Sequence, residues 1–491
     1  MPFKVVFLIP PFTGKDMISL NATRRAPHVG VAYLAAMIQT QDIKFKIIDM
    51  NLGYTFEMIE SIISHFTPSL ICMTIYSPGH KIAYQVLNRI KLSSDAKIVI
   101  GGPHVSVMGQ KSFLPSVDYA IVGEGEYSLL NLITALSSMK KPQEEKFKQI
   151  NGLIWRHGEE IIENKRNFIL DLDNLPFPAF ESFEIEKYKC YGDKRLVIVS
   201  SRGCPHRCNF CCTNLSMGLR YRSRSPKNII SELEYWINKG WRKFDFNDDV
   251  FTQEKERVTT ICQMIIEKKL NIEFNLYVGL RVDTVSETLL KLLKRAGCKF
   301  ISYGCESGND KILKIIKKDI TTEQVRKTSE LTAKVGINHK INFMIGHAGE
   351  TFDDALQTIK FAKSLPCNFV GFNNLTPYPG TVAYEYVLNT EGARFLYPVE
   401  DYLDDLSHKS TTPVFETQEF PKKFRAKALI MGQELERLTL LRFCYGKYWG
   451  TLLYVLSKNN KLWQYVEKIR KRMVSTQLGE SIYNVFFKSP W

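Results

Sequence analysis

Strand-length apolar runs alternate with helix-period segments along most of this 491-residue chain, and this pattern constrains the fold more than any other feature. Early runs such as KVVFLI and LICMTI carry no polar residues at alternate positions, so both faces of each strand should be buried. Such strands, separated by helices, predict a parallel, doubly wound α/β sheet of the Rossmann or flavodoxin type. The expected strands cover residues 4–9, 45–50, 70–75, 97–102 and 118–123.

A second series of strand and helix patterns begins at residue 195. Six βα units favour a partial TIM-type barrel, (βα)6, over the eight-stranded form, with functional loops at the carboxyl ends of its strands. The expected strands cover residues 196–201, 243–248, 272–279, 299–304, 341–346 and 368–375. We therefore expect a doubly wound domain over 1–140, an irregular linker over 141–192, a partial barrel over 193–410 and a helical region over 411–491.

Composition excludes several classes of protein. Hydrophobic residues make up 44% and charged residues 24%, which excludes a largely disordered chain. Most of the 11 cysteines stand singly in apolar segments and predict reduced thiols. The start, MPFKVVFLIPPF, predicts a first strand and not a signal peptide, and no window of 18 uninterrupted apolar residues predicts a membrane span. A cytoplasmic protein is expected.

The positive charge is concentrated near the C-terminus. The formal net charge is +15, and residues 421–491 hold 14 Lys and Arg against 4 Glu. Because the rest of the chain is nearly balanced, we expect no nucleic-acid partner. Basic and aromatic residues interleave in FCYGKYWGTLLYVL, KLWQYVEKIRKRM and IYNVFFKSPW. This pattern suits a peripheral membrane contact, a helical cap over the barrel mouth, or a solvated basic face.

A cysteine cluster follows the first barrel strand. Cys204, Cys208 and Cys211 have the spacing C-x3-C-x2-C in CPHRCNFC. Four cysteines normally complete an iron–sulfur cluster or a structural zinc site, so three on one loop suggest a cluster with one open iron. The alternative is zinc, with His206 or Cys212 as fourth ligand. Otherwise Cys212 is a packing residue.

The loop CPHRCNFC resembles the signature of radical S-adenosylmethionine enzymes, C-x3-C-x-aromatic-C. FDFNDDVF, GLRVDTV, YGCESGN, MIGHAGET and LTPYPGTVAYE resemble later strand motifs of that family, so the resemblance covers roughly residues 195–385. It implies a 4Fe-4S cluster on the three cysteines. The residues it implies for binding S-adenosylmethionine are Phe210, Asp248, Asp249, Arg281, Glu306, Ser307 and Gly346.

These residues also allow plainer interpretations. Asp248 and Asp249 suit an ammonium group, or serve as solvated carboxylates or helix caps. Arg281 could bind a carboxylate through both nitrogens, or form a surface salt bridge. Glu306 could accept hydrogen bonds from ribose hydroxyls. The chain departs from the family at His347 and Ala348, where leucine and proline are usual, which makes His347 a candidate substrate-side group.

The N-terminal domain resembles the cobalamin-binding domain that precedes this barrel in one branch of the family. The resemblance rests on IPPF, RRAPHVGVAYLAA, GGPHVS and GEGEYSLL. The contacts it implies are Pro11, Ser77, Gly101, Gly102, His104, Gly123, Glu124 and Gly125. The motif D-x-H-x-x-G, which supplies a lower histidine ligand in related domains, is absent, and His80 is the nearest candidate for a cobalt ligand. An ordinary flavodoxin-like domain is the alternative.

Together these resemblances imply a radical enzyme with a 4Fe-4S cluster, S-adenosylmethionine and cobalamin. A deoxyadenosyl radical would remove hydrogen from an unactivated carbon of a small-molecule or lipid substrate, and methylcobalamin would supply a methyl group. A reductant such as flavodoxin or ferredoxin is the implied partner. The alternatives are a radical cyclisation, rearrangement or oxidation without methyl transfer and, more distantly, a non-catalytic zinc and nucleic-acid-binding module.

Overall fold

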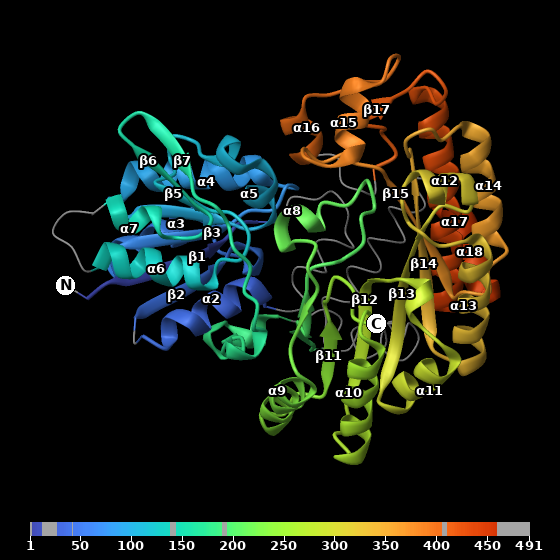
Figure 1. Cartoon of the computed structure of the whole chain (residues 1–491), viewed down its shortest axis with the longest axis horizontal. Helices are drawn as coiled ribbons and strands as arrows, with labels where there is room; N and C mark the ends of the chain where they lie inside the picture. Colours follow the sequence, from blue (N-terminus) through green and yellow to red (C-terminus); the bar gives the residue numbers. More distant parts are fainter. Residues whose placement is uncertain are drawn as a thin grey trace.

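The computed structural model describes residues 2–11, 27–41, 43–137, 144–188, 194–404 and 410–458. Two α/β halves lie side by side, the first coloured blue to teal and the second green to red (Figure 1). The short helix α8 (Thr213–Met217) lies between them.

The first half is built on a seven-stranded sheet with the order β2-β1-β3-β4-β5-β6-β7. Its strands are β1 (Lys4–Ile9), β2 (Lys44–Asp49), β3 (Leu70–Thr74), β4 (Lys97–Gly101), β5 (Tyr119–Ile121), β6 (Leu153–His157) and β7 (Glu160–Glu163). Strands β1 to β5 pair in parallel at the five predicted places. The doubly wound fold is therefore confirmed.

Helices cover both faces of this sheet, which is why its strands are apolar throughout. Alternate residues of β1 enter different cores: Val5 and Phe7 pack with α2 (Val29–Gln39) and α6 (Glu126–Ser137). Val6 and Leu8 pack with the helices of the opposite face. The remaining helices of this half are α3 (Phe56–Phe66), α4 (His80–Ser93), α5 (Pro103–Met108), α7 (Glu144–Lys148), η1 (Met50–Leu52) and η2 (Gly109–Ser112).

Residues 144–163 differ from the irregular linker expected there. They form α7 and an antiparallel hairpin, and β6 extends the sheet by pairing with β5. Three apolar residues, LIW, are too short a run to distinguish a strand from a loop, but pairing with β5 leaves Trp155 only 1% exposed. The later part of the segment packs between the halves, where Phe180 contacts Trp236 with ring centroids 5.4 Å apart. Its short helices are η3 (Leu172–Asn174), η4 (Phe180–Ser182) and η5 (Ile185–Lys187).

The second half is a six-stranded parallel sheet with the order β15-β14-β13-β12-β11-β8. Its strands are β8 (Leu196–Ile198), β11 (Lys243–Phe246), β12 (Glu273–Leu280), β13 (Cys298–Glu306), β14 (Asn338–Ile345) and β15 (Phe369–Asn374). All six lie where the sequence predicted them, in unbroken chain order, so the partial barrel is confirmed. Its helices are α9 (Pro226–Asn238), α10 (Lys255–Glu267), η6 (Val282–Thr284), α11 (Glu287–Arg295), α12 (Asp310–Ile315), α13 (Thr322–Val335) and α14 (Phe352–Lys363).

The C-terminal helix α17 (Lys422–Tyr445) lies along the last barrel strand, at the outer side of the molecule (Figure 1). The remaining elements are β9 (Ser201–Arg202), β10 (Arg222–Ser223), α15 (Val382–Asn389), β16 (Arg394–Phe395), α16 (Val399–Asp404), β17 (Phe415–Glu416) and α18 (Lys447–Ser457). The basic segments KLWQYVEKIRKRM and IYNVFFKSPW lie outside the described residues.

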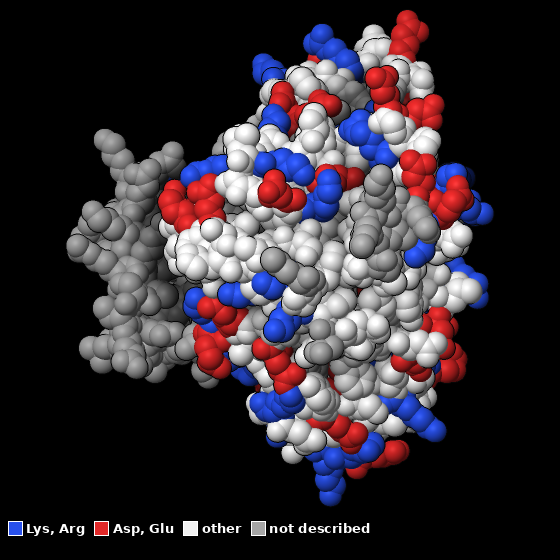
Figure 2. Space-filling view, turned by 90° about the vertical axis from the view of Figure 1, so that its left-hand side faces the viewer, with Lys and Arg blue, Asp and Glu red and all other residues white. Residues whose placement is uncertain are grey.

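Among the helices that the structure describes, none is long and apolar enough to cross a membrane. Figure 2 shows Lys and Arg side chains intermixed with Asp and Glu over the face that it displays.

Candidate active site between the two halves

The cysteine loop leaves the first barrel strand through β9 and ends at α8. Gly203 has a φ of 82°, and the Cys204 amide donates to the Gly218 carbonyl at 3.3 Å. A tight turn brings the next two cysteines together, with the Cys211 amide donating to the Cys208 carbonyl at 3.2 Å. The three predicted thiols therefore lie on one compact loop and act electrostatically on one another.

These three cysteines are partly buried. Burial raises the pKa of Cys204 to about 11, and burial also raises the pKa of Cys208 above its usual value. Lys318 and Arg281 oppose that rise at Cys208 because their positive charges favour a thiolate. Iron binding must displace the thiol protons, so cations beside the loop assist ligation.

The Arg281 guanidinium has two nitrogens paired with Asp283 and one nitrogen without a partner in the described structure. Nε and Nη2 donate to the two carboxylate oxygens of Asp283 at 3.0 and 2.9 Å. The Nη1 atom is buried without a hydrogen-bond partner in the described structure. A buried guanidinium nitrogen without a partner has the chemistry to bind an anionic group, such as a carboxylate.

Lys318 is a site residue that the sequence analysis missed. It is 6% exposed and donates to the Glu306 carboxylate at 3.1 Å, which places it beside one predicted S-adenosylmethionine contact. Burial works against its charge, but Glu306 and Cys208 hold the pKa of Lys318 above its usual value. In the sequence, Lys318 lies in an ordinary polar turn, so the sequence carries only a weak signal for it. The structure shows that it lies between two residues with positive φ, Lys317 and Asp319.

The paired aspartates divide their roles. Asp248 accepts the Ser200 amide at 2.7 Å, the Ser201 hydroxyl at 2.7 Å and the Ser200 hydroxyl, so its carboxylate is engaged in holding the strand end. Asp249 accepts the Gly203 amide at 2.8 Å and also lines the interdomain cavity described below. Burial raises the pKa of Asp249 to about 6. Of the two, Asp249 is the better placed to contact a ligand.

The fifth-strand loop is held from the C-terminal helix. The Glu350 carboxylate accepts the Gly346 and His347 amides at 2.5 and 2.9 Å, and Arg425 of α17 donates to the Gly346 carbonyl at 2.9 Å. His347 is fully buried, 5.7 Å from Phe210 between ring centroids, and burial lowers its pKa to about 4. Ser307 lies behind this loop, with its hydroxyl 3.2 Å from that of Thr358 in α14. It is a packing residue in this structure.

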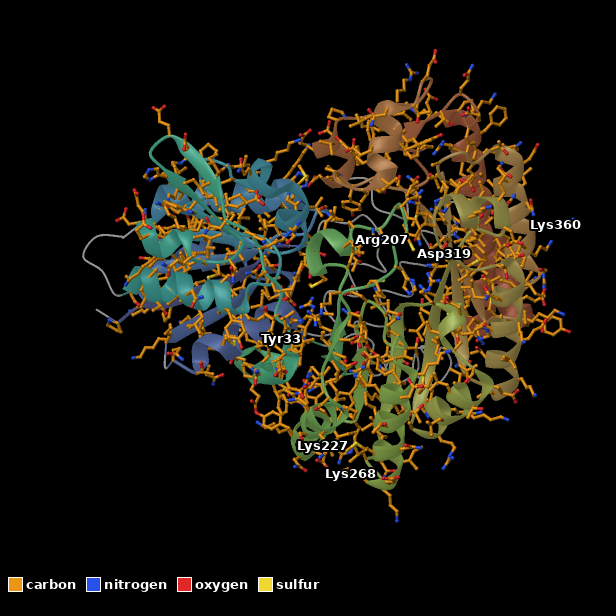
Figure 3. All side chains as sticks on the ribbon, in the orientation of Figure 1. Tyr33, Arg207, Lys227, Lys268, Asp319 and Lys360 are labelled. Atoms are coloured by element: carbon orange, nitrogen blue, oxygen red, sulfur yellow. The ribbon has the colours of Figure 1, made fainter. Side chains whose placement is uncertain are left out.

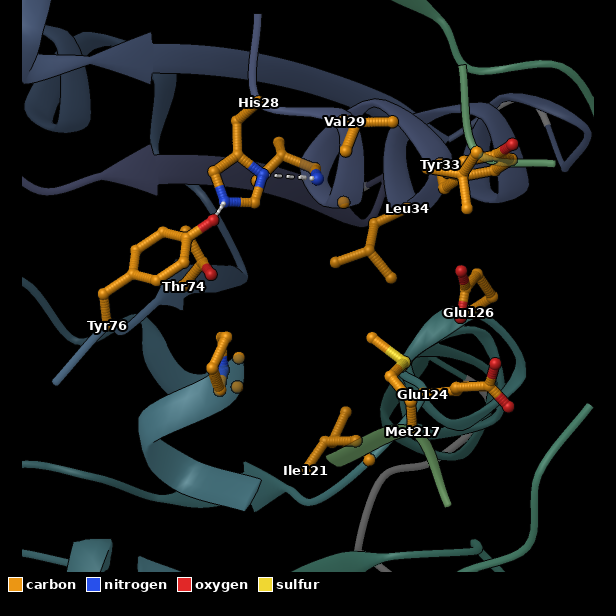
Figure 4. A pocket seen from close by; sticks show the side chains of 18 of the residues that line it. His28, Val29, Tyr33, Leu34, Thr74, Tyr76, Ile121, Glu124, Glu126 and Met217 are labelled. Atoms are coloured by element: carbon orange, nitrogen blue, oxygen red, sulfur yellow. Dashed lines mark hydrogen bonds between the residues drawn. The ribbon is translucent and has the colours of Figure 1, made fainter. Parts of the chain in front are cut away.

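A cavity of about 340 Å³ opens where the two halves meet (Figure 4). The carboxyl ends of β1, β3, β4 and β5 form one side, where a doubly wound sheet binds its ligands. Five of the eight predicted cobalamin contacts line it: Gly101, Gly102, Gly123, Glu124 and Gly125. The barrel contributes Arg202, Met217, Asn247, Asp249 and Val278 to the opposite side.

The other predicted cobalamin contacts lie outside the lining of this cavity. Ser77 is 3.1 Å from His104, and the His104 ring stacks on His80 at 4.4 Å between centroids. The His80 Nδ1 atom is 2.8 Å from the Ser77 carbonyl and 3.3 Å from an Asp404 carboxylate oxygen of α16. His80 therefore belongs to a buried polar cluster, and this position does not favour it as a cobalt ligand. Pro11 is half-buried beside the cavity and does not line it.

His28, which is not among the predicted cobalamin contacts, lines the cavity instead. Its Nδ1 accepts the Val31 amide at 3.1 Å and so caps α2, and its Nε2 lies 2.7 Å from the Tyr76 hydroxyl (Figure 4). Both ring nitrogens are engaged, and burial lowers its pKa to about 4, so the ring stays neutral.

Comparison with known proteins agrees with this two-part site. Residues 17–133 match the B12 binding domain and residues 198–362 match the radical SAM superfamily. An uncharacterized methyltransferase of Pyrococcus horikoshii is 33% identical over 78% of this chain and 83% of its own length. The chain belongs to the cobalamin-dependent radical S-adenosylmethionine methyltransferase family.

Two solved structures share the fold of this chain. The methyltransferase TsrM from Kitasatospora setae, with cobalamin and a [4Fe-4S] cluster bound, has a TM-score of 0.69 at 17% identity over 81% of each chain. The enzyme OxsB has a TM-score of 0.67 at 18% identity, over 99% of this chain and 75% of its own. The anaerobic magnesium-protoporphyrin IX monomethyl ester cyclase of Rubrivivax gelatinosus is 26% identical over 72% of this chain and 65% of its own.

The residues fit the cofactors of this family, which are a 4Fe-4S cluster, S-adenosylmethionine and cobalamin. Three thiols lie on one loop beside two cations, Lys318 and Arg281, and Arg281 has a guanidinium nitrogen without a partner in the described structure. This arrangement suits a cluster that keeps one iron for an amino-acid ligand. A single zinc ion needs ligands that converge within about 2.3 Å of one point. In the described residues, no group of three or more His, Cys, Asp or Glu side chains is arranged in that way.

Proposed function

We propose that this methyltransferase acts on an unactivated carbon of a small, largely apolar substrate held between its two halves. The observation that carries the proposal is the shared cavity, in which the carboxyl ends of the first sheet face Asp249 and Arg202 beside the cysteine loop. Apolar side chains such as Leu34, Val278 and Met217 line much of it.

The residues have separable tasks in this proposal. The family cofactors supply a radical that abstracts hydrogen and a methyl group that replaces it. Cys204, Cys208 and Cys211 would hold the cluster, and Arg281 Nη1 with Lys318 would hold the carboxylate of S-adenosylmethionine. Glycines 101, 102, 123 and 125 would let a corrinoid approach the strand ends.

The domain limits follow as part of the proposal. We assign residues 1–140, extended by the 153–163 hairpin, to cobalamin binding and residues 193–410 to the radical barrel, with the helical region after 411 supporting the last strand.

Replacing one cluster ligand tests the proposal. Cys208→Ala should abolish the visible absorbance of the reconstituted cluster and the formation of deoxyadenosine from S-adenosylmethionine under reducing conditions. Cys212→Ala is the matched control, since Cys212 is a neighbouring, partly buried thiol that we assign to packing, and it should keep both signals. Deoxyadenosine formation by Cys208→Ala would overturn the proposal.

A radical cyclisation or oxidation is the second candidate, because relatives include proteins named as cyclases. The mass of the product distinguishes them. A gain of one methylene unit, with the carbon derived from labelled S-adenosylmethionine, supports methylation, whereas a product that contains no labelled carbon supports cyclisation or oxidation.

Radical S-adenosylmethionine enzymes need a reductant, and we propose a flavodoxin or ferredoxin for this role. We also propose that α18 makes a peripheral contact with lipid or an apolar substrate. Its Tyr448, Trp449, Leu452 and Val455 side chains are all exposed, between 47% and 86%. Replacing Trp449 and Leu452 with Ser should reduce sedimentation with liposomes containing anionic lipid, and unchanged sedimentation would exclude this face as the contact.

A further inference from the structure

Two carboxylates of the first half and two guanidiniums of the barrel form a buried ionic network between the halves. Arg202 donates to Glu124 at 2.9 Å and to Glu126 at 2.6 Å. Arg222 donates to both oxygens of Glu124 at 2.8 and 2.7 Å. All four side chains are at most 9% exposed. The network therefore balances two negative charges with two positive ones away from water, where unpaired charges are costly.

Each oxygen of the Glu124 carboxylate already accepts two hydrogen bonds. Its Oε2 also accepts the Ile169 amide at 2.7 Å, which brings in the segment that connects the halves. The resemblance to cobalamin-binding domains implied Glu124 as one of the cobalamin contacts. The structure points to a different task for that carboxylate, which is to hold the barrel.

One end of the network forms part of the cavity wall. Glu124, Glu126 and Arg202 all line the cavity, and the two carboxylates are visible at its rim in Figure 4. Tyr33 of α2 lies on the side of the first half that faces the barrel (Figure 3), with its ring 5.2 Å from the Arg202 guanidinium. Any ligand that orders this wall also orders the network.

The other end holds the first cluster cysteine. Arg202 is joined to Cys204 through Gly203, whose conformation leaves no space for a side chain. Arg222 donates through Nη2 to the Met217 carbonyl at 2.8 Å, and the neighbouring Gly218 carbonyl accepts the Cys204 amide. Arg202 thus fixes the backbone just before Cys204, and Arg222 fixes the segment to which the Cys204 amide donates.

We propose that Glu124, Glu126, Arg202 and Arg222 are positioning residues that couple occupancy of the cavity to the conformation of the cysteine loop. A cofactor bound in the cavity stabilises the loop in its cluster-binding form, and by thermodynamic reciprocity the cluster raises the affinity of the cavity. The inference rests on the proposed function only in placing cobalamin in the cavity.

A titration with hydroxocobalamin tests this coupling without any substrate. The full-length protein is titrated with and without its reconstituted cluster, and the ratio of the two dissociation constants is the readout. We expect wild type to bind at least about fivefold more tightly when the cluster is present. In Glu126→Gln the ratio should fall to about one, with iron content kept close to that of wild type.

Asp401→Asn is the matched control. Asp401 also pairs across the halves, with Lys81 at 2.5 Å, but that pair is about half exposed and lines neither site. It should keep the wild-type ratio. A Glu126→Gln ratio equal to that of wild type, or a wild-type ratio of one, would overturn the coupling.

Two further measurements test the coupling if Glu126→Gln binds too little iron to be compared with wild type. Arg202→Lys keeps the positive charge and loses the two-pronged geometry, so its ratio should fall between one and the wild-type value. In wild type, hydroxocobalamin should slow hydrogen exchange of residues 200–222, and unchanged exchange there would contradict the proposal. None of these experiments measures a methylated product. If the proposed methylation failed, the binding and exchange results would therefore still test the coupling.

Discussion

At the scale of the residue, Gly203 shows how one position decides whether the cysteine loop can form. It adopts a φ of 82°, and a Cβ there would lie 2.3 Å from the Arg220 carbonyl oxygen. Its amide also donates to Asp249. Backbone strain, a steric limit and a hydrogen bond therefore meet one residue before the first cluster ligand.

Gly203→Ala should lower the iron bound per chain by more than about half, because the added methyl group forces the backbone at Cys204 away from Arg220. Iron and sulfide analysis after anaerobic reconstitution measures this. Gly240→Ala is the control, since Gly240 has a φ of 89° and open space where its Cβ would lie. Equal iron loss in both variants would show that strain alone, and not the contact with Arg220, is responsible.

Glu350 gives a prediction about pH. Burial raises its pKa from 4.5 to about 7, so the folded protein binds the proton more tightly than the unfolded chain. Its contribution to stability is fully present below pH 4.5 and is lost as pH rises through 7, by about 3 kcal/mol in total. From pH 5 to 8 the Tm of wild type should therefore fall by a few °C relative to Glu350→Gln.

The comparison with Glu350→Gln isolates this group. The pKa of His347 is lowered by burial to about 4, so its contribution is present above pH 6.5 and is lost as pH falls. That opposite trend occurs in both proteins and cancels in the difference. A Tm difference that does not change with pH would show that Glu350 is ionised throughout the range.

At the scale of the element, the open edge of the partial barrel is covered by a helix. The backbone amides of Val370 and Phe372 in β15 donate to Thr439 at 3.3 Å and Glu436 at 2.7 Å, both on α17. Side chains thus replace the next strand that a closed barrel would provide. The same helix carries Arg425 to the fifth-strand loop, which connects the edge of the barrel with the candidate active site.

Glu436→Ala should destabilise the protein by about 1–3 kcal/mol, because a strand amide loses its acceptor at a site that α17 shields from water. Thermal denaturation followed by circular dichroism gives the change in Tm. Glu434 also lies on α17, where it is half-exposed and pairs with Lys458. The free energy of unfolding of Glu434→Ala should stay within about 0.5 kcal/mol of wild type. Equal effects would show that α17 does not protect the edge in this way.

At the scale of the whole molecule, one apolar core continues from the first sheet into the barrel. The cluster that contains Phe7 and Leu132 also contains Phe180 and the barrel residues Trp236 and Phe244. Together with the buried ionic network, this continuity predicts that the halves unfold together.

Calorimetry tests this cooperativity. Wild type should show one main thermal transition, and Phe180→Ala should shift the whole transition downward without splitting it, at a cost of about 3–5 kcal/mol. Two separate transitions in wild type, or a shift of only one part in the variant, would show that the halves are independent units.

Local patterns in the chain were sufficient for the eleven predicted strands, the two sheet types and the cysteine loop. Periodicity, apolar strand runs and ligand spacing each depend on residues that are close together in sequence. The β6–β7 hairpin was missed because a run as short as LIW becomes a strand only by pairing with β5.

Tertiary structure alone decided which polar side chains share the site. Lys318 reaches Glu306, Arg425 reaches Gly346 and Arg202 reaches Glu124 across 12, 79 and 78 residues of chain. The same packing placed His28 in the lining of the cavity and left His80 outside it. The cysteine spacing indicated a metal site, and the resemblance of short local motifs to a known family implied which cofactors the chain binds, because such motifs are read from residues close together in sequence. The arrangement of the charges around them arises only when distant segments pack and must neutralise one another out of water.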